Sequence, residues 1–559
     1  MLSWLKPNRA LAGVAILCVL GSFIVACHAQ EAPATYPVRG VVLNSFTRRP
    51  IARVLVDGQS DAVLTDNDGR FEINLTASMA NIAVRRPGYN PTGATFAHPV
   101  KVGPNTPELT FYLTPEANIT VHVTLSGGDA ADGIRFMAYR KRIFGGRGMW
   151  MAQGNYTTDS DGNLRMMNLE APASYILCST PTEDSMPAAG SGKTTYGYPP
   201  VCYPGVTDLS TASPLTVSPG QQLEAEITIA RQPFYPVSIL VPNRPQGQPA
   251  GISISDQTWR GIGFPARFNA QQGLAEVNLP NGRYYAESRS NNGKTSAYGR
   301  IDFQVTGGPV VGLSMALHPL SPIAVEIHKD LTSANDRAHT GIVVGSAMAG
   351  ANPGINISLI PVDSLTANMG GHNLQHPAGS TDDSYFEMAD VLPGRYWVQT
   401  NAFQGYVSSI SSGGADLARE PLAVGPGGAA APIEISLSDN GGRIDAAINP
   451  SSLGNSASSA DEGVSSIVFG YAIPQFPSTA QIAMAAAQTT YHLMFGNLAP
   501  GTYRVVAFDK PQEIDMDDPQ AMARINSQSQ TVTVEPGAAA TVQVDVIQTA
   551  QNGGEGQTQ

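Results

Sequence analysis

Apolar and polar residues alternate in short runs along most of this chain of 559 residues. Val121, Val123 and Leu125, for example, alternate with His122 and Thr124. A period of two places every second side chain on the same face of a β-strand, so these runs predict strands with one buried face. Clusters of Gly, Pro, Asn and Asp separate the runs and predict turns. The pattern is that of an all-β chain.

One short phrase occurs four times, in which a leucine is followed by Pro or Gly and then by a tyrosine that opens a new alternating run. Three copies are Leu-Pro-Asn-Gly-Arg-Tyr, Leu-Pro-Gly-Arg-Tyr and Leu-Ala-Pro-Gly-Thr-Tyr, which end at Tyr284, Tyr396 and Tyr503. A degenerate copy ends at Tyr175. Pro and Gly favour a turn before each tyrosine. A turn and strand that return at domain-sized spacing predict a string of similar β-sandwiches.

The composition fits a turn-dense β protein and excludes one class of partner. Gly and Pro number 57 and 42, and 42% of the residues are hydrophobic. Only 14% are charged, compared with roughly 25% in typical soluble domains. The formal net charge is −12, and the basic residues are not gathered into one long run. Nucleic acid is therefore excluded as a partner, since it needs a concentrated positive face. No cofactor is expected.

Residues 1–29 are predicted to be an export signal, with two basic residues before an apolar stretch over residues 11–26. This stretch is short for a membrane span. Cys27 ends a sequence similar to a bacterial lipobox, which would make it a lipidated N-terminus. Ordinary cleavage after Ala29 is the interpretation we favour. Both alternatives place the mature protein outside the cytoplasm, in the periplasm, at the outer membrane surface or in the medium. They leave a lipid anchor as the one membrane attachment.

The mature chain keeps two cysteines, Cys178 and Cys202. An even pair in an exported chain predicts a disulfide, which would stabilise the fold by about 3 kcal/mol on the loop-entropy model. A two-cysteine metal site is the alternative, and it lacks nearby His or Cys partners.

Residues 36–115 contain four predicted strands, with the turn Thr-Asp-Asn-Asp-Gly at residues 65–69 leading into the third. In order and residue choice this segment resembles the carboxypeptidase regulatory-like domain, a transthyretin-like β-sandwich. The resemblance implies an accessory role without catalytic residues. The turn returns as Thr-Asp-Ser-Asp-Gly at residues 158–162. The whole string is similar in layout to secreted multi-sandwich proteins of environmental bacteria.

The predicted fold class is therefore a series of tandem Ig-like or transthyretin-like β-sandwiches behind a signal peptide. One short helix is expected after Asp518, with this residue as N-cap and Pro519 in the first turn. The predicted units are the signal peptide 1–29, the regulatory-like sandwich 36–115, a sandwich with the disulfide loop at 116–231, sandwiches at 232–319, 320–437 and 438–548, and a disordered tail at 549–559.

Several motifs that suggest chemistry have simpler interpretations. Residues 190–194 (Gly-Ser-Gly-Lys-Thr) lack the first glycine of a phosphate-binding loop. The turns at Asp66 and Asp159 lack the twelve-residue ligand spacing of a helix-flanked calcium loop and are expected to cap their own backbone. His372 and His376 have no adjacent Glu and are expected in a loop. No catalytic or metal-binding residues are therefore predicted.

One basic stretch stands out in this acidic chain, because it combines four cations with two aromatic residues. One interpretation is a solvated hairpin that turns at Gly145 and Gly146. The other is a patch for an anionic or stacking ligand, such as an acidic polysaccharide or lipid headgroups. The candidate ligand patch comprises Arg140, Lys141, Arg142, Phe144, Arg147 and Trp150.

These observations predict a non-catalytic exported protein with a structural, adhesive or polymer-recognition role at the cell surface. Its expected partner is an extracellular polysaccharide or a surface protein. The alternative is a carbohydrate-binding protein with starch-binding-like modules, which stack sugars on exposed aromatic rings. The candidate rings are Trp150, Trp259, Tyr285 and Trp397.

Overall fold

The computed structural model describes fourteen segments of the chain, and every structural statement below concerns these residues. They are residues 34–58, 61–76, 79–91, 98–184, 195–243, 251–257, 262–291, 296–331, 354–362, 374–403, 405–452, 467–480, 482–487 and 492–548. The predicted signal peptide with Cys27, the motif at residues 190–194, Trp259, His372 and the predicted tail lie outside them.

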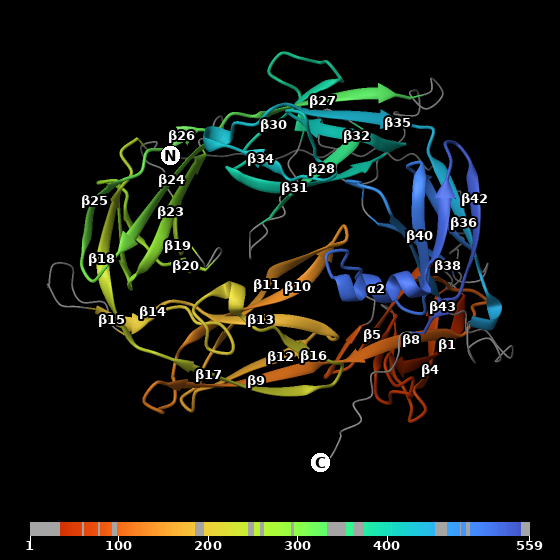
Figure 1. Ribbon diagram of the computed structural model, residues 1–559. Helices are drawn as coiled ribbons and strands as arrows, with labels where there is room; N and C mark the ends of the chain where they lie inside the picture. Colours follow the sequence, from red (N-terminus) through yellow and green to blue (C-terminus); the bar gives the residue numbers. More distant parts are fainter. Residues whose placement is uncertain are drawn as a thin grey trace, which may run out of the picture.

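The all-β fold class is confirmed, because the described segments form five two-sheet β-sandwiches in chain order, here called sandwiches 1 to 5 (Figure 1). Sandwich 1 pairs the sheets β4-β1-β8-β6 and β3-β2-β5-β7. Its strands are β1 (Thr35–Asn44), β2 (Leu55–Asp57), β3 (Ala62–Leu64), β4 (Arg70–Thr76), β5 (Met79–Arg85), β6 (Tyr89–Pro91), β7 (His98–Lys101) and β8 (Leu109–Pro115).

Sandwich 2 pairs the sheets β12-β9-β17 and β11-β10-β13-β16. Its elements are β9 (Ala117–Leu125), β10 (Arg135–Phe144), β11 (Arg147–Thr157), β12 (Asn163–Leu169), β13 (Ala173–Ser179), the 3₁₀ turn η1 (Leu209–Thr211), β16 (Leu215–Val217) and β17 (Gln222–Ile229).

Sandwich 3 pairs the sheets β14-β15-β18-β22-β21, to which β25 adds through β18, and β20-β19-β23-β24-β26. Its strands are β14 (Thr182–Glu183), β15 (Thr195–Tyr198), β18 (Gln232–Leu240), β19 (Gly251–Asp256), β20 (Gly263–Phe264), β21 (Arg267–Asn269), β22 (Leu274–Leu279), β23 (Gly282–Asn291), β24 (Ser296–Val305), β25 (Val310–Ser314) and β26 (His318–Pro319).

Sandwich 4 pairs the sheets β29-β30-β27-β35-β32-β33 and β28-β31-β34. Its elements are β27 (Ile323–Asp330), β28 (Ile355–Pro361), β29 (Leu374–Gln375), β30 (Tyr385–Met388), β31 (Gly394–Ala402), β32 (Tyr406–Ser412), β33 (Ala415–Asp416), β34 (Leu422–Val424), the 3₁₀ turn η3 (Pro426–Gly428) and β35 (Ile433–Ser438).

Sandwich 5 pairs the sheets β39-β36-β42 and β38-β37-β40-β41, with β43 beside β40. Its elements are β36 (Gly442–Ile448), β37 (Val468–Pro474), β38 (Ala483–Ala487), β39 (His492–Leu498), β40 (Gly501–Phe508), α2 (Pro519–Gln528), β41 (Gln530–Val534), β42 (Ala539–Val544) and β43 (Val546–Ile547). The predicted helix is confirmed as α2. Asp518 is its N-cap, as predicted, and its side chain accepts hydrogen bonds from the amides of Gln520 and Ala521.

The same strand arrangement recurs in all five sandwiches. In each sandwich a strand near its start (the first strand, except in sandwich 3, where the β14–β15 arm precedes it) lies beside one antiparallel strand and one parallel strand that comes last or nearly last in the unit. The central strand and its two neighbours are β1 with β4 and β8, β9 with β12 and β17, β18 with β22 and β25, β27 with β30 and β35, and β36 with β39 and β42. Two neighbouring parallel strands need a crossover connection between them. In each sandwich this connection runs through the second sheet, so the same topology produces both layers.

Each sandwich also has its own hydrophobic core. The five main clusters of buried apolar side chains span residues 38–113, 117–229, 234–317, 323–437 and 444–546. They form because the alternating residues of both sheets point inward, as Val38, Val42 and Ile73 do in sandwich 1. Among the described residues, the fully buried side chains of each cluster come from one sandwich, and Tyr198 of the β14–β15 arm packs against the core of sandwich 2.

One segment crosses the predicted boundary at residues 231 and 232. Strands β14 and β15 lie between Cys178 and Cys202 in the sequence, yet β15 pairs with β18 of sandwich 3. The side chain of Asn278 donates a hydrogen bond to Glu183 over 2.8 Å, and Arg231 forms an ion pair with Asp184. The described part of the disulfide loop is therefore an arm that extends the sheet of the next sandwich.

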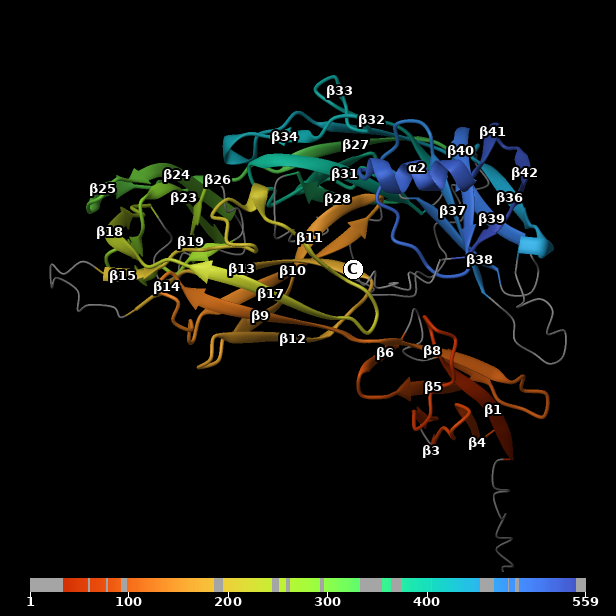
Figure 2. The same cartoon turned by 60° about the horizontal axis from the view of Figure 1, so that its bottom comes forward.

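Sandwiches 2 to 5 are arranged around a common centre, as Figure 1 shows. Sandwich 1 lies to one side of this ring, which is clearer in the turned view of Figure 2. The β10–β11 hairpin points from sandwich 2 into the centre, toward β31 and α2. No helix among the described residues is long and apolar enough to span a membrane.

Candidate functional site

The centre of the ring is occupied by the tip of the β10–β11 hairpin, here called the basic hairpin. Its strands pair in register as far as Phe144 and Arg147. The two residues between them, Gly145 and Gly146, have φ angles of 54° and 85°. A two-residue turn with positive φ at both positions matches the twist of paired strands and strongly favours glycine. The Gly-Gly pair therefore lets the hairpin continue to its tip without splaying.

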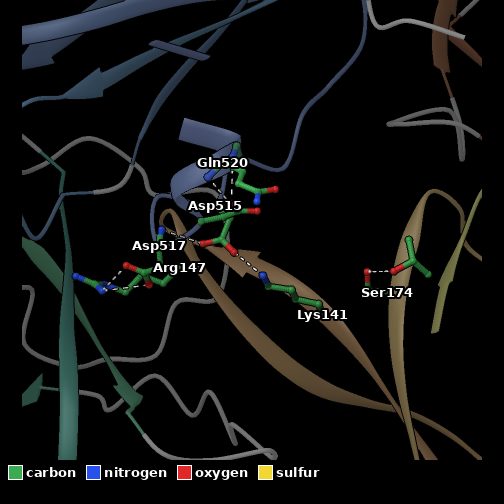
Figure 3. A network of polar contacts seen from close by, with 9 residues as sticks. Lys141, Arg147, Ser174, Asp515, Asp517 and Gln520 are labelled. Carbon is green, nitrogen blue, oxygen red and sulfur yellow. Dashed lines mark hydrogen bonds and ion pairs between the residues drawn. The ribbon is translucent and has the colours of Figure 1, made fainter. Parts of the chain in front are cut away.

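The tip meets a segment of sandwich 5 that precedes α2, here called the acidic loop (residues 513–518). Four of its six residues are carboxylates: Glu513, Asp515, Asp517 and Asp518. Three of them pair with cations of the basic hairpin, two of which are drawn in Figure 3. The ion pairs are Lys141 Nζ–Asp515 Oδ2 (2.6 Å), Arg147 Nη1–Asp517 Oδ1 (3.2 Å) and Arg142 Nη1–Glu513 Oε1 (3.8 Å).

Hydrogen bonds to the turn fix its position between two sandwiches. The amide of Met516 donates to the carbonyl of Gly146 over 2.6 Å. The side chain of Gln399, on β31 of sandwich 4, donates to the carbonyl of Phe144 over 2.9 Å. A Cβ atom on Gly145 would lie only 1.8 Å from the Gln399 amide nitrogen. A larger residue here would therefore displace the Gln399 side chain from its hydrogen bond, in addition to straining the backbone.

A small apolar contact lies beside these bonds. Met149 and Ile360 are buried against each other, with Phe144 and Trp397 packed around them. The Arg147 guanidinium lies 3.8 Å from the centre of the Trp397 ring, which is a cation–π contact. The hub, defined as the basic hairpin tip with these contacts in sandwiches 4 and 5, therefore joins sandwich 2 to two sandwiches that lie much further along the chain.

Arg140, the remaining cation, is used inside sandwich 2. Its side chain is 8% exposed and forms an ion pair with Glu170, which also contacts Arg142 at 3.1 Å. All four cations of the candidate ligand patch are therefore paired with carboxylates of the same chain. The predicted hairpin with its turn at Gly145 and Gly146 is confirmed, but the interpretation of it as solvated is wrong, because the tip is docked between sandwiches. The ligand-patch hypothesis stays a prediction.

The predicted disulfide is confirmed: Cys178 and Cys202 are bonded and fully buried. They form a second cluster with Tyr139 and with Ile262 of sandwich 3, and Trp150 packs against it. The disulfide thus closes the base of the β14–β15 arm at the contact between sandwiches 2 and 3.

The described rings proposed for sugar stacking all contact other parts of the chain. Tyr285 is 6% exposed, and the Arg300 guanidinium lies 4.2 Å from its ring centre. The Arg147 guanidinium lies over the Trp397 ring, and Trp150 packs against the disulfide cluster. These contacts occupy ring surface that a sugar would need.

The repeated tyrosine phrase builds the same hydrogen bond four times. Each tyrosine hydroxyl donates to a backbone carbonyl in the turn just before it, which is the geometry of a tyrosine corner. Burial raises the pKa of Tyr175 to about 12. The bonds are Tyr175–Glu170 (2.9 Å), Tyr284–Pro280 (2.9 Å), Tyr396–Leu392 (2.8 Å) and Tyr503–Ala499 (2.8 Å).

The two acidic turns cap their own backbone, as predicted. Asp66 Oδ1 accepts from the amides of Asp68 and Arg70, and Asp159 Oδ1 does the same for the amides two and four residues on. His376 stacks on Phe386, with 4.8 Å between the ring centres. The described residues contain no group of three or more His, Cys, Asp or Glu arranged to hold a metal ion.

A small hollow lies at the hub between Arg147, Trp397, Gln399 and Thr479. Its free volume of about 20 Å³ is room for a water molecule rather than for an organic ligand. At this point the hub is therefore a packed contact and not a ligand pocket.

Sequence reasoning did not identify the acidic loop. Its signal was present, because four carboxylates in six residues complement the one dense basic stretch of the chain. Arg147 and Asp517 are 370 residues apart, however, and alternation within strands carries no information on such a pairing.

Comparisons with known proteins assign no family. No family model matches the chain, and no curated protein matches its sequence. Among solved structures, the TIE protein of Bacillus anthracis is 11% identical with a TM-score of 0.15, and the match covers 66% of this chain and 64% of that one. A streptococcal ancillary pilin is 11% identical with a TM-score of 0.19, over 51% of this chain and 100% of the pilin. The shaft pilin SpaA of Lactobacillus rhamnosus GG is 11% identical with a TM-score of 0.14, over 37% of this chain and 98% of the pilin. Scores this low support no argument about function, and the regulatory-like identity of residues 36–115 stays a prediction.

Proposed function

We propose that this chain is an exported, non-catalytic scaffold of five β-sandwiches with a structural or adhesive role at the cell surface. The observation that carries the proposal is the hub. The densest run of basic side chains in the sequence, with the aromatic residues beside it, is used to hold sandwiches 2, 4 and 5 together. A chain that uses such side chains to fix its own shape is suited to presenting surfaces at set positions.

The buried disulfide supports a location outside the cytoplasm, because such bonds persist in oxidising compartments. The partner proposed is an extracellular polysaccharide or a surface protein, which five similar sandwiches could engage on their outer faces.

The location can be tested in the native host with an epitope-tagged full chain. Protease treatment of intact cells, together with thiol alkylation before lysis, should show an accessible protein whose Cys178 and Cys202 resist alkylation. A variant without residues 1–29 is the control and should stay protected and reduced. Full-length protein found inside the cell with both thiols free would refute the proposal. Attachment of purified protein to host cell walls, compared with a single-sandwich protein, then measures the adhesive role.

A further inference from the structure

The ring of sandwiches 2 to 5 is closed without a covalent connection. Sandwiches 2, 3, 4 and 5 follow one another in the chain, so backbone joins each of them to the next. The contact from sandwich 5 back to sandwich 2 is made mainly by the acidic loop against the basic hairpin. The same hairpin also contacts β31 of sandwich 4 through Gln399 and Trp397. A second noncovalent contact, Arg48–Asp509 at 3.5 Å, joins sandwich 5 to sandwich 1 outside the ring.

The closing contact is mainly electrostatic. Its three ion pairs link two segments of opposite charge. The side chains of Arg142 and Arg147 are 33% and 31% exposed, and those of Glu513 and Asp517 are 52% and 57% exposed. These two pairs are weakened by salt, since the screening length falls from about 8 Å at physiological ionic strength to about 3 Å at 1 M. The third pair, Lys141–Asp515, is screened less, because the Asp515 side chain is only 11% exposed.

The apolar share of the hub is small by comparison. It buries two side chains, Met149 and Ile360, whereas each sandwich core contains at least fourteen. Loss of the hub therefore leaves the cores intact, and the sandwiches can separate while they stay folded.

From these features we infer that the basic hairpin and the acidic loop form a charge-dependent clasp that opens the ring when its ion pairs are screened or reversed. Opening uncovers Phe144 and the cations Lys141, Arg142 and Arg147, which belong to the ligand patch that the sequence predicted. It also uncovers Trp397, which the sequence offered as a ring for sugar stacking. The inference concerns the shape of the chain, and it goes beyond the proposed surface role.

The test uses the full mature chain with the double variant Lys141→Glu/Arg147→Glu. A donor and an acceptor dye on surface sites of sandwiches 2 and 5 report the distance across the clasp, and small-angle X-ray scattering reports the radius of gyration. We expect both quantities to increase in the variant, and to increase in the wild type as salt rises from about 0.05 M to about 1 M. Adding Asp515→Lys and Asp517→Arg restores the pairs with exchanged signs and should return both quantities to the closed values.

A matched control makes the same change in charge away from the hub. Arg39 and Arg70 of sandwich 1 form exposed pairs with Glu72 and Glu108, at 2.8 and 3.0 Å. The variant Arg39→Glu/Arg70→Glu should keep the closed dimensions. Circular dichroism of every variant checks that the sandwiches remain folded. The clasp is refuted if the hub variant keeps the wild-type distance, or if the exchanged variant stays as open as the reversed one.

Discussion

The tyrosine corner of sandwich 5 shows how much the hydrogen bond of the repeated phrase stabilises a sandwich, because this bond can be removed by deleting a single hydroxyl group. Tyr503 is 4% exposed, and its hydroxyl donates to the Ala499 carbonyl over 2.8 Å. Its ring packs edge-on against Phe476, with 5.4 Å between the centres. Tyr503→Phe keeps this ring contact and removes only the hydroxyl.

The expected loss follows from the burial of that bond. A protein hydrogen bond contributes about 1 kcal/mol net, and a carbonyl left buried without a partner can raise the cost to about 3 kcal/mol. For a unit of this size, 1 kcal/mol corresponds to a shift of about 4 °C in midpoint. We therefore expect the unfolding midpoint of sandwich 5 to fall by at least about 4 °C, with the other four transitions unchanged.

Differential scanning calorimetry of the full chain measures the unfolding midpoints. Hydrogen exchange of the β40 amides identifies which transition belongs to sandwich 5. Tyr196→Phe is the matched control, because Tyr196 is 42% exposed on the β15 strand and surface changes usually stay within about 0.5 kcal/mol. Equal midpoints for wild type, Tyr503→Phe and Tyr196→Phe would refute the idea that the corner hydroxyl stabilises the sandwich.

Two further predictions concern sandwich 2. Because burial raises the pKa of Tyr175 to about 12 from 10.0, the unfolded chain ionises first. The neutral Tyr175 side chain therefore contributes fully to the free energy of unfolding below about pH 10. This contribution, about 3 kcal/mol, is lost as the pH rises toward 12. Urea unfolding across this range should show the decline, and Tyr175→Phe should reduce it by this amount; the remainder comes from other buried tyrosines such as Tyr139, whose pKa burial also raises to about 12. A decline of equal size in both proteins would contradict the assignment. The double variant Cys178→Ser/Cys202→Ser, which opens a loop of 24 residues, should lose about 3 kcal/mol in urea unfolding and become insensitive to reductant. Unchanged stability would show that the disulfide contributes little.

The features that could be predicted from the sequence are those that depend only on residues close together in the chain. Alternation predicted the strands, because it is the local cause of a one-sided core, and the Asp518-Pro519 pair predicted the start of α2. The tyrosine phrase marked four corners, since turn, tyrosine and acceptor carbonyl lie within six residues. Contacts between sandwiches were not predicted. The β14 and β15 strands are two and four residues long, too short to show whose sheet they join.

The solvated-hairpin interpretation failed for a related reason. A cation in a strand looks the same in sequence whether it faces water or a carboxylate of another sandwich. Only the fold places Arg147 beside Asp517, so predicting the site at the ring centre required the arrangement of sandwiches 2 to 5.

The long separation within the hub also sets an order of events during synthesis. Asp517 follows Arg147 by 370 residues, and Asp509 follows Arg48 by 461. A growing chain therefore exposes the hairpin long before the ribosome reaches the loop that covers it. Each earlier sandwich can fold alone in the meantime, because each has its own core. The hub forms only after sandwich 5 has been synthesised. A product truncated before this unit would therefore consist of folded sandwiches that lack the hub.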